Sequence, residues 1–265
     1  LAIDLIAGIL CNVYLNKRKK RRAQSLNKKL LKQTESIPMG DFIITNNYQF
    51  DSIPDQQMVI HAIDSRIWLM ANEDKELKQA LLQSDILVPN GAGITLAARW
   101  LTGKQIHNVS RDDLHLSILQ HLDKIAGSVF YLGASDRTLA LITERILTEY
   151  PNIRVKTYSP PYRDSFSEEE TNKMITAINE FKPDVLFIGM SVSKQEKWIA
   201  TNRHLLHTHL ISGIGAVFGF YGGTTSYPPQ WRKQQSLSAI KILITALQIK
   251  NRKKSIKTST EYETN

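Results

Sequence analysis

The sequence predicts a doubly wound α/β domain, in which helices cover both faces of a mostly parallel β-sheet. From Gly40 onward, short runs rich in β-branched and aromatic residues alternate with longer amphipathic runs. Several of the short runs are apolar at every position, as are strands buried on both faces of a parallel sheet. Strand–helix alternation of this length is typical of doubly wound folds.

The predicted elements follow in order along the chain. Strands are expected at Phe42–Thr45, Met58–Ala62, Ile86–Val88, Val129–Leu132, Ile153–Tyr158, Val185–Met190 and Leu210–Ser212. Helices are expected at Lys75–Gln83, Ile94–Leu101, Asp112–Ile125, Arg137–Tyr150, Glu168–Phe181 and Lys194–Leu206. Gly103 and Gly127 stand at C-cap positions, and Pro151 and Pro183 stop the helices before them. A last helical pattern, Leu237–Lys250, could pack on the domain or lie on a membrane.

Composition is that of an ordinary globular protein. The chain has 265 residues, of which 42% are hydrophobic and 22% charged, enough for one large domain or two small ones. Its single cysteine, Cys11, excludes an internal disulfide framework and fits a reducing compartment.

The net charge of +9 is concentrated at the ends of the chain. Residues 1–33 carry a net +8, and residues 250–257 hold five basic side chains, so the body between them is slightly acidic. Nucleic-acid binding calls for a basic face on the folded domain, which this distribution does not provide. Basic ends on such a body fit an anionic membrane surface, and a pair of solvated tails is the alternative.

The N-terminal segment joins an apolar run, Leu1–Leu15, to the basic run Lys17–Arg22. It is short for a bilayer span, which needs roughly 20 apolar residues. The end of a membrane helix, an interfacial anchor and a signal-like segment are all open, although the order of the two runs disfavours the last. We expect residues 1–40 to form this segment and a linker, 41–235 the α/β domain, and 236–265 a C-terminal helix and tail.

Ligands of open α/β sheets bind at the carboxyl ends of the strands, and four strand-end turns carry suitable residues. Gly91 and Gly93 follow a strand and open a helix, where backbone N–H groups can approach a diphosphate. Gly133, with Ser135 as a candidate helix cap, repeats this arrangement. A tight turn without a ligand is the alternative in both places.

The third and fourth turns offer more chemistry. Lys194, Gln195 and Trp198 crowd one helix start, where they could contact a phosphate, a sugar hydroxyl and a ring. Glu196, with a serine three residues before it, fits a capping box that needs no ligand. The fourth turn, Gly213–Gly223, has five glycines in eleven residues. It predicts close backbone approach to a ligand, a flexible lid or a plain connection.

Other kinds of site find little support in the sequence. His204, His207 and His209 have no cysteine to support them, so we predict no metal site. The chain has neither a G-x-S-x-G nucleophile elbow nor a DxD pair. An incomplete glycine fingerprint argues against a dinucleotide-binding oxidoreductase.

Two of these turns form a specific pattern, Lys194-Gln195-Glu196-Lys197-Trp198 and then Gly213-x-Gly215-x-x-Phe218 after the next strand. Together they resemble the WecG/TagA/CpsF family of bacterial glycosyltransferases, and the resemblance covers roughly residues 55–235. The segments upstream that match in order and spacing are Asn90-Gly91-x-Gly93, Val109 to Asp113-Leu114, Leu132-Gly133, and Tyr150-Pro151 through Ser159-Pro160-Pro161-Tyr162.

This resemblance implies a Rossmann-like α/β domain with a C-terminal helical appendage, and an inverting, metal-independent transferase without a cofactor. It implies transfer of an N-acetylmannosamine-type or related sugar from a UDP donor to a polyprenyl-diphosphate-linked acceptor, in wall or surface polymer synthesis at the cytoplasmic face of the membrane. A homo-oligomer is left open. The residues expected to contact substrate are Gly91, Gly93, Gly133, Ser135, Lys194, Gln195, Glu196, Trp198, Gly213 and Gly215.

The chain departs from the family pattern at polar positions. Asn90 stands where the family has the Asp favoured as general base, and an amide cannot take a proton near neutral pH. Further replacements are His61 and Ile63 for a family Thr and Asn, and Gly219 for a family Asp. In an active enzyme Asn90 would orient the acceptor, and Asp113, His61 or Asp64 would act as base. The alternative is a catalytically degenerate module that binds a nucleotide-sugar or glycolipid within a membrane assembly.

Overall fold

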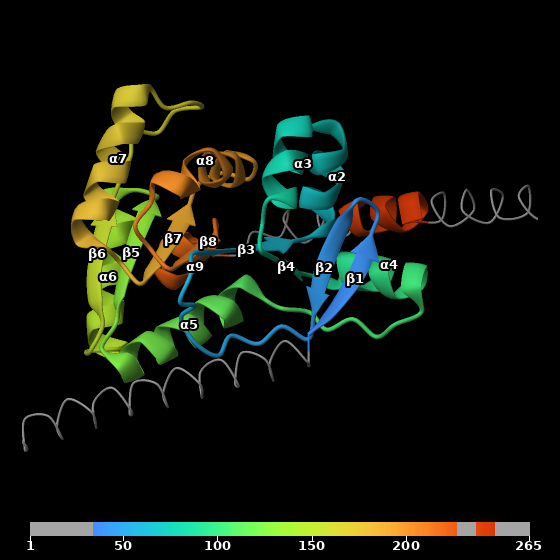
Figure 1. Ribbon diagram of the computed structural model, residues 1–265, viewed down its shortest axis with the longest axis horizontal. Coiled ribbons are helices and arrows are strands. Elements are labelled where there is room, and N and C mark those ends of the chain that lie inside the picture. Colours follow the sequence, from blue (N-terminus) through green and yellow to red (C-terminus); the bar gives the residue numbers. More distant parts are fainter. Residues whose placement is uncertain (1–33, 227–236, 247–265) are drawn as a thin grey trace, which may run out of the picture.

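The computed structural model describes residues 34–226 and 237–246. Within them, six parallel strands form the main sheet in the order β4-β3-β8-β7-β5-β6 (Figure 1). The strands are β3 (Met58–Ile63), β4 (Ile86–Pro89), β5 (Ser128–Gly133), β6 (Arg154–Tyr158), β7 (Val185–Gly189) and β8 (Leu210–Gly213). The predicted α/β class with a mostly parallel sheet is confirmed.

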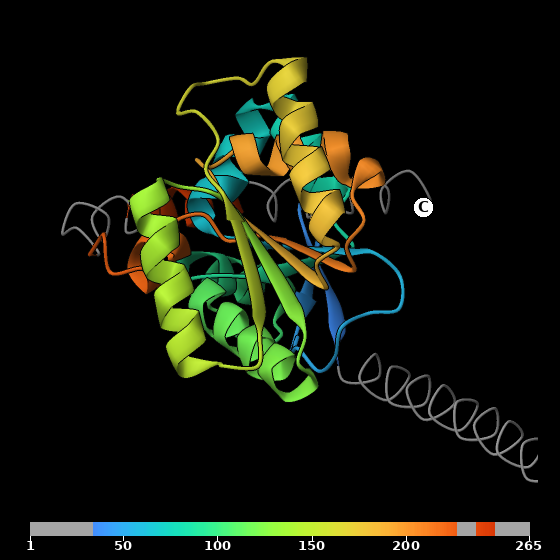
Figure 2. The same ribbon diagram turned by 90° about the vertical axis from the view of Figure 1, so that its left-hand side faces the viewer.

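Helices cover both faces of this sheet. α5 (Arg111–Ile125) and α6 (Asp136–Glu149) lie on one face, and α7 (Glu168–Phe181) and α8 (Lys194–Asn202) lie on the other (Figure 2). The remaining helical elements are α2 (Ser65–Glu73), α3 (Lys75–Leu82), α4 (Ala92–Thr102), the 3₁₀ helix η1 (Arg203–Leu205) and α9 (Val217–Tyr221).

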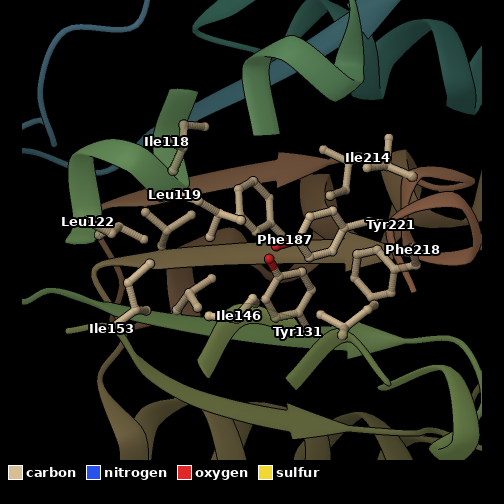
Figure 3. Close-up of a cluster of buried hydrophobic side chains, with 14 of the residues drawn as sticks. Ile118, Leu119, Leu122, Tyr131, Ile146, Ile153, Phe187, Ile214, Phe218 and Tyr221 are labelled. Carbon is tan, nitrogen blue, oxygen red and sulfur yellow. The ribbon is translucent and has the colours of Figure 1, made fainter. Parts of the chain in front are cut away.

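The core follows from the alternation of side chains along buried strands. In β5, Val129 and Tyr131 pack against α5, α6 and α9, whereas Phe130 and Leu132 pack against α7 and α8. Figure 3 shows the first of these clusters, in which Tyr131 lies beside aromatic rings from β7 and α9. Because both faces of the strand are buried, its sequence is apolar without a period of two.

Residues 35–39, which the sequence analysis assigned to a linker, form a strand instead. β1 (Glu35–Met39) pairs antiparallel with β2 (Phe42–Asn46) through a two-residue turn in which Gly40 has φ 65°. Ile37 and Ile44 are buried, and burial alternates along both strands on either side of them. A hairpin with one face packed on the core gives this alternation. The predicted strand at residues 42–45 is therefore real, but it lies outside the parallel sheet.

Several helix boundaries differ from those predicted. The helix α2 was missed, although Asp64 caps it by accepting hydrogen bonds from the N–H groups of the second and third helical residues. α9 was also missed, and the helix from Lys194 ends at Asn202 before η1 continues the turn. Gly103 caps α4 with φ 74° as predicted, but Ala126, not Gly127, is the left-handed C-cap of α5.

Residues 237–246 are helical and pack on the domain through Ile242 and Ala246. Leu237, Ile240 and Ile244 form an exposed apolar stripe on the outer side of this helix. Among the described residues, none of the helices combines the length and the apolar character needed to cross a bilayer. The predicted apolar and basic N-terminal runs and the basic C-terminal tail lie outside the described residues.

Candidate active site

A cleft of about 870 Å³ opens where β3, β5, β7 and β8 end. This volume suits a nucleotide-sized ligand, because ligand pockets are typically about 300–1,000 Å³. Its walls come from the turn after β5, the loop 159–166, the start of α8 and the segment 214–225, with a cationic end at the start of α2. Parallel strands bring these separate segments to one edge of the sheet.

The turn after β5 lies directly against the end of β7. Gly133 has φ 124°, and a Cβ at this position would stand 2.3 Å from the carbonyl oxygen of Gly189. Ala134 donates its N–H to the same carbonyl at 3.2 Å, and Ser135 caps α6 through the N–H of Thr138. Gly133 and Ser135 both line the cleft, as the sequence predicted, and their contact with a substrate stays a prediction.

The fourth turn, Gly213–Gly223, forms the opposite wall of the cleft and is closely packed. A Cβ at Gly213 would stand 3.1 Å from both the Gln195 side chain and the His61 ring, and Gly215 has φ 51° beside the same Gln195. The ring of Phe218 covers Gly189 so closely that a Cβ there would approach it to 2.5 Å. Gly215 lines the cleft and Gly213 lies behind it. The glycines of this turn therefore allow close packing around Gln195.

The start of α8 contains a buried polar pair. Gln195 donates from Nε2 to Oε1 of Glu196 at 2.9 Å, and Oε2 of Glu196 accepts the N–H of Ser193 at 2.8 Å. Both side chains are almost completely buried, but Gln195 also lines the cleft and Glu196 does not. Trp198, expected to offer a stacking face, is instead packed with α7 in the core below. It lies one turn after Gln195 on the same buried side of α8, deeper in the core.

Ser193 is strained, with φ 77° and ψ −44°. Such a backbone costs on the order of 1–3 kcal/mol and persists only where its surroundings fix it. Its hydroxyl donates to Oδ2 of Asp74 at 3.1 Å, and the ammonium of Lys197 lies 2.7 Å from the same oxygen. The hydrogen bond from Lys197 lowers the pKa of Asp74 to about 2. Asp74 thus fixes the strained turn that brings α8 to the cleft.

Lys194, the first residue of α8, lines the cleft but points to a neighbouring loop. Its ammonium donates to the carbonyl oxygen of Arg163 and lies 3.6 Å from the centroid of the Phe166 ring. Burial lowers the pKa of Lys194. The expected phosphate contact would therefore have to displace two contacts within the protein.

A cationic end of the cleft lies at the start of α2. Arg66 and Arg111 both line it, and within the described part of the chain the Arg66 side chain forms no hydrogen bond or ion pair. Arg111 donates to the carbonyl oxygen of Ala62 at 2.9 Å, and both of its terminal nitrogens lie 3.4 Å from Oδ2 of Asp64. Two guanidinium groups against one carboxylate leave this end positive, which favours an anionic group.

The four candidate catalytic residues do not meet. Asp64 lines the cleft, whereas Asp113 is exposed on the first turn of α5 outside it. His61 is buried behind Gln195, and neither ring nitrogen has a hydrogen-bond partner among the described residues. Burial lowers the pKa of His61, and the charge of Glu196 opposes this only in part.

The Asn90 turn lies outside the cleft lining, and its contacts are with other parts of the protein. Asn90 donates its N–H to the Ile63 carbonyl at 2.8 Å, and the N–H of Gly91 donates to Oδ1 of Asn108. A Cβ at Gly93 would stand 2.1 Å from Oγ of Ser65 and 2.7 Å from Cβ of Ala239, on the C-terminal helix. Close helix packing is a sufficient reason for the glycine at position 93, and its contact with a substrate stays a prediction.

Arg66 and Arg111 were missed by the sequence analysis. Arg66 belongs to α2, which was not predicted, and Arg111 immediately precedes the predicted start of α5. A signal was present, because a cation in the first turn of a helix opposes the helix dipole. An arginine at such a position is therefore expected to make a contact outside its own helix.

The comparisons agree with this architecture. The sequence profile described as the Glycosyl transferase WecG/TagA/CpsF family matches residues 45–240. The chain is 26% identical over 208 residues to the N-acetylglucosaminyldiphosphoundecaprenol N-acetyl-beta-D-mannosaminyltransferase of Bacillus subtilis, a match that covers 75% of this chain and 78% of that protein. The Bacillus spizizenii protein of the same name is 25% identical over 61% of each chain, and the one from Staphylococcus aureus strain NCTC 8325 is 26% identical over 56% of each. Since the profile spans the whole parallel sheet and every wall of the cleft, the chain belongs to the WecG/TagA/CpsF family of glycosyl transferases.

Proposed function

We propose that this protein transfers an N-acetylmannosamine-type or related sugar from a UDP donor to a polyprenyl-diphosphate-linked acceptor. The observation that carries the proposal is the cleft at the ends of β3, β5, β7 and β8, which combines exposed backbone turns with a positive end. The relatives are named for transfer to a diphosphoundecaprenol-linked sugar, which supports the acceptor class.

Arg66 and Arg111 are proposed to face the diphosphate of the donor. A diphosphate leaving group gains negative charge as its bond to the sugar breaks, and positioned cations stabilise that charge. The two guanidinium groups supply such charge within the protein, and a metal-independent reaction is proposed on that basis together with the family membership.

Asp64 is the proposed general base, because it is the cleft-lining member of the four sequence candidates. Its Oδ1 caps α2, while Oδ2 lies 3.4 Å from the Arg111 nitrogens, beyond the usual length of a charge-assisted hydrogen bond. Oδ2 can therefore accept a proton from the acceptor hydroxyl. The acceptor oxygen then bonds to the anomeric carbon as the bond to the diphosphate breaks, which inverts that carbon and releases UDP.

Association with the cytoplasmic membrane surface is part of the proposal. Leu237, Ile240 and Ile244 are each about half exposed and follow helical spacing, as on an interfacial helix. The basic ends of the sequence would meet anionic lipid headgroups. Sedimentation with vesicles of anionic rather than zwitterionic lipid checks this part by itself.

The test is release of UDP by the detergent-purified full chain. UDP-N-acetylmannosamine and related donors are supplied with a lipid-diphosphate-linked N-acetylglucosamine acceptor, and the matched control omits the acceptor. Acceptor-dependent UDP release, with a product one sugar heavier by mass spectrometry, is expected.

Asn90 favours one second candidate, the degenerate binding module, since its amide cannot replace a catalytic carboxylate. Tight UDP binding by calorimetry, without UDP release from any donor, would support that module and reject the transferase.

A further inference from the structure

We propose that Lys194 is a positioning residue that latches the loop 159–166 over the cleft, instead of a ligand for substrate phosphate. The inference rests on the proposed function in one respect only, namely that the loop encloses a sugar nucleotide. The latch itself is a property of the protein without substrate.

The contacts of the Lys194 ammonium all lead to this loop. It donates a hydrogen bond to the Arg163 carbonyl and sits over the face of Phe166, 3.6 Å from the ring centroid. A cation over an aromatic face is attracted by the ring quadrupole, and more strongly when partly desolvated. Both partners line the cleft, as does Lys194, so these contacts join two parts of its wall.

The other contacts of the loop are with the turn after the neighbouring strand β5 and with α7, the helix that follows the loop. Ser159 donates to the Ala134 carbonyl at 2.8 Å, and Arg163 pairs with Glu170 of α7 at 3.1 Å. Between these ties the side chain of Tyr162 is fully exposed. Figure 2 shows the loop standing away from the sheet beside the start of α7. Lys194 adds a contact between the loop, which follows β6, and α8, which follows β7.

The base of the latch is fixed. Lys194 follows the strained Ser193, which Asp74 holds together with Lys197. A side chain that starts from so constrained a turn has a defined reach, which suits it to hold a loop in one position. Removing the ammonium should therefore release the loop and leave α8 in place.

The experiment uses the full chain without substrate. Lys194→Met keeps the aliphatic stem and removes the charge. Hydrogen exchange of residues 159–166 and tryptic cleavage after Arg163, both followed by mass spectrometry, should become about tenfold faster, since these contacts restrain local opening. Lys194→Arg should stay close to wild type. The matched control is Lys173→Met, because Lys173 pairs with Glu169 on the surface of α7 and shares neither of the loop contacts of Lys194.

A second variant separates the latch from a general loss of structure. Phe166→Leu keeps apolar bulk but removes the ring face, so it should give part of the same acceleration and add little in the double variant with Lys194→Met. Unchanged exchange and cleavage in Lys194→Met would overturn the latch, as would weaker UDP binding with an unchanged loop. In the transfer assay both variants should raise KM for the donor more than they lower kcat, and a loss confined to kcat would also overturn it. Absence of transfer in the wild type would reject the proposed function alone.

Discussion

Two glycine turns that look alike in the sequence serve different purposes in the molecule. The turn after β5 places Gly133 where a Cβ would strike the backbone of β7, and this turn lines the cleft. The turn after β4 places Gly93 where a Cβ would strike α2 and the C-terminal helix, away from the cleft. A glycine after a parallel strand thus indicates that another group lies very close to the backbone. The segments packed around the glycine then show whether that group is a ligand or a helix of the protein.

The largest expected effect tests whether the chemistry lies on the cleft side. Asp64→Asn should lower kcat/KM by roughly 10²–10⁴-fold, the usual contribution of a general base. Asparagine also caps helices well, so the fold should be kept. The UDP-release assay measures the loss, and Asp113→Asn should leave the rate within about threefold because that residue is exposed outside the cleft. A loss in Asp113→Asn with none in Asp64→Asn would reverse the assignment.

Much of the fold could be predicted because it depends on local patterns. All the buried strands and six helices lie close to their predicted positions, since apolar runs and caps determine them. The hairpin was missed because its first strand starts before Gly40, next to a basic segment that hides the alternation. The site was harder, since Arg111 and Lys194 contact segments that are distant in the sequence, and Arg66 lies on a helix that was not predicted.

The two glycines can be compared directly by stability. Gly133→Ala combines a positive φ with a 2.3 Å approach to a rigid carbonyl, and should lower the free energy of unfolding by roughly 3 kcal/mol or more. Gly93→Ala meets the Ser65 hydroxyl and Ala239 but needs no positive φ, so roughly 1–3 kcal/mol is expected. Urea unfolding measures both. The folded Gly93→Ala protein should bind UDP as the wild type does, and weaker binding at unchanged stability would make the β4 turn part of the ligand site.

Acid should weaken the core beneath the β5 half of the cleft. His115 is buried against Tyr131, with Nε2 2.6 Å from the phenol oxygen, and burial lowers its pKa from the ordinary 6.5 to about 3. Between these values the unfolded chain binds the proton and the folded protein does not. Stability is therefore complete above pH 6.5 and falls with decreasing pH, by up to about 1.4 kcal/mol per unit for this group. His115→Gln, whose amide can still bond to Tyr131, should flatten the dependence measured by urea unfolding. An unchanged slope would assign it to other groups, such as His61.

The smallest effect is expected at the position where the family resemblance is most informative. Asn90→Asp introduces the carboxylate that the family resemblance leads us to expect, but the residue lies outside the cleft lining, with its N–H bonded to β3. If Asp64 has taken over the proton transfer, Asn90→Asp should change the rate of UDP release by less than about threefold, because a base adds rate only within hydrogen-bond reach of its proton. The decisive test is the double variant, in which Asn90→Asp is combined with Asp64→Asn. Rescue there by about tenfold or more would place the acceptor hydroxyl near the end of β4, and the turn after β4 would then belong to the catalytic half of the sheet edge. Without rescue, the proton transfer depends on the cleft alone, and the glycines of the Asn90 turn serve packing.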